Sequence, residues 1–334
     1  MEETKETTAE KKELGRIGGT TVSAIVGLNQ WESPYGAYLK LRHEVEPTPD
    51  NIAMARGRRY EPIVADVFAG GRPEYRVAHN RQGTDEPEIY EHAQYPFLIG
   101  HPDRLLYDAE TNELVAGLEI KTSNWSNISK WGEEGTDAIP TQYLIQCQWY
   151  AGLAQLPEWR VAVAFLDDGG TLRMFREYNV IADNELYETL VAAAVDFWNN
   201  HVVPGVPPEI GKVDETTKRW INNRYPANIA PLEHATPQEE QLMAHYLQKK
   251  EALDAAQREL DYVEAALKMA IGDRDGLESE TFGKVTWKRS KDSKRVDYRG
   301  ICKELNPPAD LIEEYTKTVE GSRRFIASGL KINI

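Results

Sequence analysis

Residues 95–123 read YPFLIGHPDRLLYDAETNELVAGLEIKTS, and this stretch decides the fold. Two runs rich in Leu, Ile, Val and Tyr flank the polar, turn-rich segment AETNE at 109–113. Apolar runs of strand length that are separated by turn residues are typical of a β-hairpin. We therefore expect two paired strands, with residues of the first strand lying opposite residues of the second.

Three charged residues stand where this hairpin would bring them together. Glu119 and Lys121 are two apart on the second predicted strand, so both side chains leave one face while Ile120 points to the other. Asp103 follows Pro102 at the start of the first strand, where pairing can place its carboxylate opposite Glu119. Two carboxylates and a lysine suit a hard divalent cation with a group that orients or deprotonates water. An exposed Glu–Lys ion pair, worth well under ~1 kcal/mol, is the alternative interpretation.

This set of residues has the chemistry that phosphodiester hydrolysis needs. The attacking water must become hydroxide-like, and charge that develops on the phosphorus oxygens must be neutralised. Mg²⁺ held by Asp103, Glu119 and the Ile120 carbonyl would supply both effects. Lys121 would then hold the nucleophilic water or stabilise the charged transition state.

The hairpin is flanked by helical patterns and further strands. In chain order we expect two short helices within 20–43, of which the second begins at Ser33–Pro34, a helix at about 51–69, a helix at 140–155, strands at 161–166 and 171–180, and a helix at about 183–201. The order helix, hairpin, helix, strand predicts an α/β (α+β) domain with a mixed central sheet flanked by helices.

The chain is expected to divide into four parts. Residues 1–13 offer almost no apolar surface and are predicted to form a disordered tail. Residues 14–205 would form the core domain. The Pro-rich run at 202–212 marks the start of a linker or strap over 206–235, and residues 236–334 form a C-terminal extension.

The extension carries a long helix and a short basic strand segment. Thr236, Pro237 and Glu239 predict a capping box at the start of a helix over 236–271, with Gly272 ending it. Tyr246, Leu253, Leu260 and Leu267 recur every seven residues, which indicates packing against the body or a partner helix. The strand FGKVTWKRS begins the basic segment 284–299. That segment would bind DNA or protein, or protect a strand edge against aggregation. Its basic residues are Lys284, Lys288, Arg289, Lys291, Lys294, Arg295 and Arg299.

Composition limits the class of protein. The 334 residues are 41% hydrophobic, enough for one sizeable core and a smaller unit. The net charge of −15 argues against a protein that coats DNA, whereas a nuclease needs carboxylates at its metals. Cys147 and Cys302 are too distant to suggest a disulfide framework, and no run approaches the ~20 apolar residues of a membrane span. We expect a cytoplasmic protein without membrane association.

With HPD at 101–103 and EIK at 119–121, the sequence resembles the PD-(D/E)xK nuclease superfamily. More narrowly it is similar to the YqaJ-type viral recombinase exonucleases, which include the phage lambda exonuclease-like and RecE-like proteins. Three further segments carry this resemblance over about residues 14–200: RIGGTTVS at 16–23, RGRRYE at 56–61, and the set Gln142, Gln146, Gln148 and Tyr150. The implied fold is a restriction-endonuclease-like core.

The resemblance also implies roles for residues outside the hairpin. Arg16 and Ser23, which flank a helix start, would hold a 5′-phosphate, although Arg16 as a solvated surface cation is the alternative. Glu61 would reach the metal site as a catalytic and metal-binding residue. Its alternative is an ion pair with Arg56, Arg58 or Arg59.

Gln142, Gln146 and Tyr150 are spaced i, i+4, i+8 and share one helix face, from which they would bind the scissile phosphate or order Lys121. A merely exposed polar stripe is the alternative. Gln148 points elsewhere, and His101 is interpreted as a turn residue.

The activity implied is Mg²⁺-dependent 5′-to-3′ exonucleolysis of double-stranded DNA ends that leaves 3′ single-stranded tails for recombination, with Mn²⁺ able to substitute. A ring-like homo-oligomer and a single-strand annealing protein as partner are implied as well. An iron–sulfur cluster is not expected because it needs four cysteine ligands. An endonuclease or structure-specific nuclease of the same fold is one alternative, and a non-catalytic scaffold that binds DNA or a partner is another.

Overall fold

The computed structural model describes residues 14–79, 88–290 and 296–317. The chain forms two compact units, one up to Arg224 and one from Tyr225 onward, and each is described by itself. The predicted tail at 1–13 lies outside the described residues, as do Lys291, Lys294 and Arg295 of the basic segment. Within the described ranges, no helix is long and apolar enough to cross a membrane.

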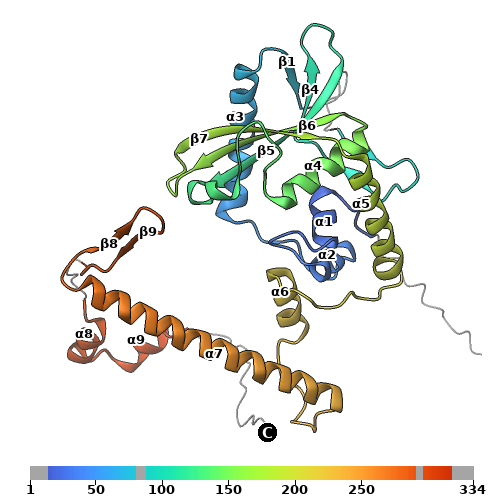
Figure 1. The fold of residues 1–334 in the computed structure, drawn as a ribbon. Coiled ribbons are helices and arrows are strands. Elements are labelled where there is room, and N and C mark those ends of the chain that lie inside the picture. The colour runs from blue at the N-terminus through green and yellow to red at the C-terminus, as the bar shows by residue number, and fades with distance from the viewer. Residues whose placement is uncertain (1–13, 80–87, 291–295, 318–334) are drawn as a thin grey trace, which may run out of the picture. The chain divides into compact units, whose positions relative to one another are not determined.

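A five-stranded sheet organises the first unit (Figure 1), in the order β1-β4-β5-β6-β7. Strands β5 and β6 are parallel and the other neighbours are antiparallel, which makes the sheet mixed as predicted. The parallel pair requires a crossover, which α4 (Thr141–Ala154) provides. The strands are β1 (Tyr75–Ala78), β4 (Arg104–Asp108), β5 (Leu114–Asn124), β6 (Glu158–Leu166) and β7 (Leu172–Ile181).

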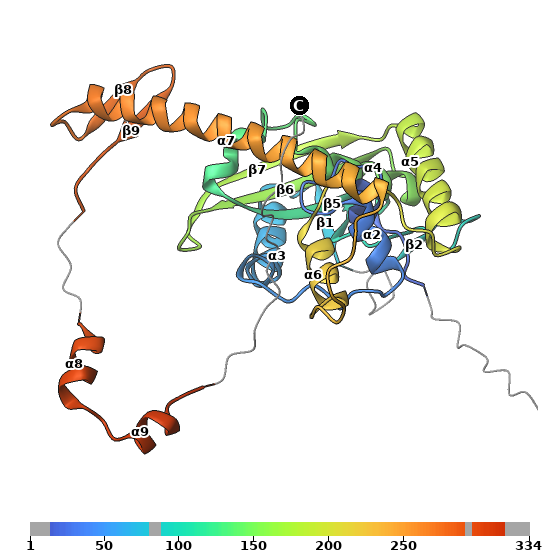
Figure 2. The ribbon, with the colours of Figure 1, turned by 90° about the horizontal axis from the view of Figure 1, so that it is seen from below.

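Helices cover both faces of this sheet. On one face, α3 (Ile52–Gly71) packs Val64 and Phe68 into a cluster with Ile120. The other cluster contains the fully buried Trp149 of α4, and includes residues of α1 (Gly19–Ile25), α2 (Pro34–Leu41) and α5 (Asn184–Phe197). Figures 1 and 2 show α3 apart from the group formed by α1, α4 and α5. The prediction of a mixed sheet flanked by helices is therefore confirmed.

The predicted first strand of the hairpin is interrupted. Its apolar run supplies β3 (Ile99–Gly100), which pairs with β2 (Tyr90–Glu91), and then β4, which starts only at Arg104. His101, Pro102 and Asp103 lie between the two strands. Pro102 has no N–H to donate to a ladder, and the break frees the Asp103 side chain to bond elsewhere.

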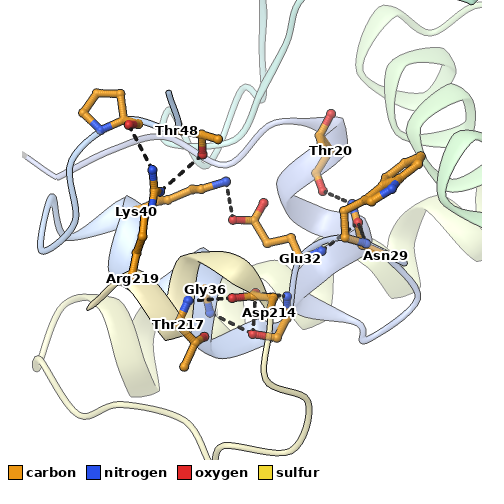
Figure 3. Close-up of polar contacts among 12 residues, drawn as sticks. Thr20, Asn29, Glu32, Gly36, Lys40, Thr48, Asp214, Thr217 and Arg219 are labelled. Atoms are coloured by element: carbon orange, nitrogen blue, oxygen red, sulfur yellow. Dashed lines mark hydrogen bonds and ion pairs between the residues drawn. The ribbon is translucent and has the colours of Figure 1, made fainter. Parts of the chain in front are cut away.

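The predicted linker at 206–235 is corrected by the structure, because it contains α6 (Glu215–Arg224) in the first unit. Asp214, 5% exposed, accepts hydrogen bonds from Ser33 N at 2.6 Å, Ser33 Oγ at 2.8 Å and Thr217 N at 2.7 Å. Figure 3 shows Asp214 between the two helices, close to Thr217 and Gly36. One buried carboxylate thus joins the starts of α2 and α6, so the core extends to Arg224.

Two short segments complete this unit, the 3-10 helix Trp125–Lys130 and the π-helix Trp198–Val202.

The second unit is built on α7 (Pro237–Ile271), whose predicted capping box between Thr236 and Glu239 is present. Gly272 ends the helix with φ of 58°, a conformation that favours glycine. The predicted strand is β9 (Gly283–Thr286), paired with β8 (Gly276–Ser279), and α8 (Tyr298–Leu305) and α9 (Ala309–Glu314) follow. The heptad residues of α7 are exposed over 37–67% of their surface: Tyr246, Leu253, Leu260 and Leu267.

Candidate active site

The hairpin β4–β5 positions the centre of the site. Arg104 pairs with Leu118, so β5 continues past the start of β4. Just before β4, Asp103 Oδ2 accepts a hydrogen bond from Ile120 N at 2.7 Å. The Asp103 carboxylate is thereby fixed beside the two residues that flank Ile120, which are Glu119 and Lys121.

Glu119 and Lys121 form a buried pair. Glu119 is 1% exposed, and Lys121 Nζ donates a hydrogen bond to Glu119 Oε1. Among the described residues, nothing hydrogen-bonds to the other oxygen, Glu119 Oε2. The Lys121 ammonium also lies 5.1 Å from the centre of the Tyr143 ring on α4. This burial excludes the exposed ion pair that the sequence left open as an alternative.

The electrostatics of the two carboxylates are unfavourable without a cation. Burial, together with the nearby Asp103 carboxylate, raises the pKa of Glu119 to about 8. Burial also raises the pKa of Asp103, against the opposing effects of Lys121 and the Ile120 N–H. Burial alone would lower the pKa of Lys121, but Glu119 and Asp103 outweigh it and the pKa of Lys121 is raised. Lys121 is therefore a cation at neutral pH.

The residues fit a divalent cation of the magnesium type. Mg²⁺ in proteins is commonly bound by one or two carboxylates, with water and substrate phosphate completing its shell. Asp103 and the unpartnered oxygen of Glu119 provide two such ligands. N–H and C=O of one strand residue point to the same side, so the Ile120 carbonyl faces the edge where Asp103 bonds. Over the described ranges, no cluster of three or more His, Cys, Asp or Glu side chains that could hold a metal is formed.

Glu61 lies at the margin of this centre. Its Oε1 accepts a hydrogen bond from Arg104 Nη1 at 2.7 Å, so its partner is none of the three arginines anticipated from the sequence. Arg104 Nη1 also lies 2.8 Å from His79 Nδ1. The charge of Glu61 contributes to the raised pKa of both Asp103 and Glu119. Sequence reasoning missed Arg104, although it directly follows Asp103.

The polar stripe of α4 is buried, which overturns the exposed-stripe alternative. Gln142 and Gln146 are each 7% exposed and Tyr150 is 5% exposed. Gln146 Nε2 donates to Tyr150 Oη at 3.1 Å, whereas the buried Gln142 Nε2 has no hydrogen-bond partner in the described structure. Gln148 bonds to Ile181 O and Asp183 N and is structural.

Arg16 and Ser23 occupy different environments. Arg16 is at the surface and pairs with Glu91 through Nη1 and Oε1 at 2.6 Å. Ser23 is fully buried in α1, where its hydroxyl donates to Thr20 O at 2.8 Å and accepts from Asn29 Nδ2 at 3.0 Å. A phosphate bound there would contact Arg16 directly. Ser23 would contribute only through the hydrogen bonds by which it holds the local structure of α1.

A cavity of about 370 Å³ begins one residue beyond Lys121. Its lining includes Thr122, Ser123 and Asn124 at the end of β5, together with Gln30, Trp31, Ala53, Arg56, Asn127, Lys130, Trp131, Pro140, Tyr143 and Leu166. This cavity could not be predicted from the sequence, because segments far apart in the chain form it.

Residues 10–156 match the family model described as the YqaJ-like viral recombinase domain. This range contains Asp103, Glu119, Lys121 and every other predicted site residue. The uncharacterized protein YqaJ of Bacillus subtilis strain 168 is 25% identical over 261 residues, which cover 78% of this chain and 76% of that protein.

Two solved structures are similar to parts of the chain. An alkaline exonuclease from Laribacter hongkongensis aligns with a TM-score of 0.41 at 18% identity, over 56% of this chain and 88% of its own. A phage-related exonuclease from Haemophilus somnus 129PT aligns with a TM-score of 0.38 at 16% identity, over 56% of this chain and 95% of its own.

Proposed function

We propose, from the match of residues 10–156 to the YqaJ-like viral recombinase domain, that this protein is a metal-dependent deoxyribonuclease. The observation that carries the proposal is the buried set of Asp103, Glu119 and Lys121, in which one oxygen of Glu119 has no hydrogen-bond partner among the residues that the structure describes. A buried carboxylate oxygen without a partner is costly, and a cation ligand is one role that accounts for it.

Each residue of the site has a task in hydrolysis of a phosphodiester. Asp103, Glu119 and the Ile120 carbonyl would hold Mg²⁺, for which Mn²⁺ would substitute, and Glu61 would assist from the margin. A bound divalent cation supplies charge neutralisation at the phosphate and lowers the pKa of bound water. Lys121 keeps its proton, so it orients water or stabilises the charged transition state as a cation. Gln142, Gln146 and Tyr150, on the buried polar face of α4, would bind the scissile phosphate or order Lys121.

We extend the proposal to a 5′-to-3′ exonuclease that acts on double-stranded ends and leaves 3′ single-stranded tails. Arg16 would receive the 5′-phosphate by exchanging Glu91, with which it forms an exposed ion pair that costs little to open. A ring-like homo-oligomer and a single-strand annealing partner complete this proposal, and both rest on the resemblance.

The test is incubation of the purified full chain with linear and with closed circular duplex DNA, in Mg²⁺ and in Mn²⁺. Degradation confined to the linear DNA is expected. Cutting of both substrates would favour an endonuclease. If neither DNA is degraded, both the exonuclease and the endonuclease hypotheses are refuted.

End recognition is tested with 5′-phosphorylated and 5′-hydroxyl linear DNA. Arg16→Ala should remove most of the preference for the phosphorylated end. Arg58→Ala is the matched control, since Arg58 also forms an exposed ion pair, with Asp50. An unchanged preference in Arg16→Ala would contradict the assignment of Arg16.

A further inference from the structure

The cavity beyond β5 has a size suited to one nucleotide. Its volume of about 370 Å³ lies in the lower part of the ~300–1,000 Å³ range of small-ligand sites. It begins at Thr122, the residue after Lys121, so a strand whose phosphodiester lies at the buried carboxylates would continue directly into it.

An aromatic connection links the cavity to the candidate catalytic centre. The Tyr143 ring contacts the Lys121 ammonium at 5.1 Å and lies 6.0 Å from the Trp31 ring, measured between centroids. Tyr143 also stacks on the buried Trp131, with 5.6 Å between the ring centroids. Trp31 itself is 59% exposed and lines the cavity. The exposed indole thus offers a flat face next to the reacting centre.

The charge of the lining is opposite to that of the protein. The whole chain carries a net charge of −15, yet both charged residues in the described lining, Arg56 and Lys130, are cationic. Arg56 donates to Asp168 O at 3.1 Å. Lys130 is exposed and forms no ion pair with any residue that the structure describes. A phosphate would neutralise it.

The backbone behind Trp31 is fixed although the indole is exposed. Asn29 Oδ1 accepts from Trp31 N at 2.9 Å and from Glu32 N at 3.1 Å, and Figure 3 shows Asn29 beside Glu32 and Thr20. Lys212 Nζ donates to Asn29 O at 3.1 Å and to Gln30 O at 2.5 Å. An aromatic side chain on a held backbone loses little entropy when a flat group stacks on it.

On the basis of the proposed nuclease function, we propose that this cavity binds one nucleotide of the DNA strand held at Asp103 and Glu119. Its base stacks on Trp31, and its phosphate faces Lys130 and Arg56. Single-strand sites commonly combine cations along the backbone with aromatic platforms for bases, and stacking tolerates any base because each has a π-face. Lys212 is a positioning residue, because it holds the backbone next to Trp31.

The test is a double-mutant cycle between Trp31 and the base. The full chain and its Trp31→Ala variant are titrated, in EDTA to prevent cleavage, with short fluorescent 5′-phosphorylated single-stranded oligonucleotides. The oligonucleotides are either intact or abasic at one position, scanned along the strand. Trp31→Ala should weaken binding of the intact strand by about 5- to 100-fold. For one abasic position, the variant and the wild type should bind equally, because the stacking partner is already missing.

Two further variants keep the test specific. Trp31→Phe should lose less affinity than Trp31→Ala, since it retains a smaller ring. Trp125→Ala is the matched control, because Trp125 is 40% exposed in the same unit but does not line the cavity. It should bind like the wild type.

The outcomes separate this inference from the nuclease proposal. Additive losses at every abasic position, or no binding of single-stranded DNA by the wild type, would overturn the nucleotide subsite. Failure of the wild type to degrade any DNA in Mg²⁺ or Mn²⁺ would instead overturn the nuclease proposal. Coupling between Trp31 and one base would still establish the subsite in that case.

Discussion

Replacement of Glu119 by glutamine should stabilise the metal-free protein at alkaline pH. Below pH 4.5, its ordinary pKa, Glu119 is protonated in both the folded and the unfolded state and has no effect on stability. Between pH 4.5 and about pH 8, the Glu119 carboxyl group ionises in the unfolded state but stays protonated in the folded state. The free energy of unfolding therefore falls as the pH rises. Once Glu119 is ionised in both states, the folded protein has lost about 5 kcal/mol of stability. This figure follows from the difference between the two pKa values, 4.5 and about 8, at ~1.36 kcal/mol per pKa unit.

The measurable quantity is the difference in unfolding free energy between Glu119→Gln and wild type. From the same two pKa values, that difference should grow by about 3 kcal/mol between pH 5.5 and pH 8 in favour of the variant. Urea unfolding followed by tryptophan fluorescence in EDTA provides the assay. Glu113→Gln, which replaces an exposed residue of the same hairpin, is the matched control and is measured at the same two pH values. A Glu119→Gln difference that is constant with pH would refute the reasoning.

Three further predictions concern activity and stability. Lys121→Ala should lower the rate of DNA degradation by at least about 100-fold with an unchanged circular dichroism spectrum, because it removes the charge at the reacting centre; retained activity would remove Lys121 from the mechanism. Asp214→Ala should lower the unfolding free energy in urea by about 3 kcal/mol, since three hydrogen bonds to one buried carboxylate are lost; a loss below 1 kcal/mol would contradict that anchoring role. Gly117→Ala should lower the midpoint temperature of thermal unfolding, because its Cβ would lie 2.2 Å from the Trp159 side chain. Gly70→Ala on α3, whose Cβ would meet open space, is the control and should not lower it. Equal midpoints for the two variants would contradict the close packing at Gly117.

The sequence predicted those features that depend on local periodicity. Strand alternation was enough to place Glu119 and Lys121 on one face and Ile120 in the core beneath α3. Capping chemistry likewise located the starts of α2 and α7, because Ser33 and Thr236 act within three residues along the chain. These signals are contained in a few neighbouring residues.

Features that depend on distant contacts could not be predicted in this way. Asp214 follows a Pro-rich run typical of a linker, and only its pairing with Ser33, 181 residues away, makes it part of the core. The alternative considered for Glu61 was an ion pair with a nearby arginine, whereas Arg104, 43 residues away, is its partner. The pairing of both groups depends on tertiary packing, which the hydrophobic pattern of one segment does not specify.

The crossover helix α4 explains why catalysis and substrate binding would be coupled. Parallel pairing of β5 with β6 forces the chain to cross the sheet, and α4 makes that crossing directly above the face that carries Glu119 and Lys121. Its first turn supplies Tyr143, whose ring lies near both the Lys121 ammonium and the Trp31 ring. A change in the tilt of the Tyr143 ring would therefore alter the position of the lysine charge and of the proposed base platform together. Tyr143→Leu should consequently impair DNA degradation and oligonucleotide binding in parallel, whereas a loss of only one of them would separate the two sites.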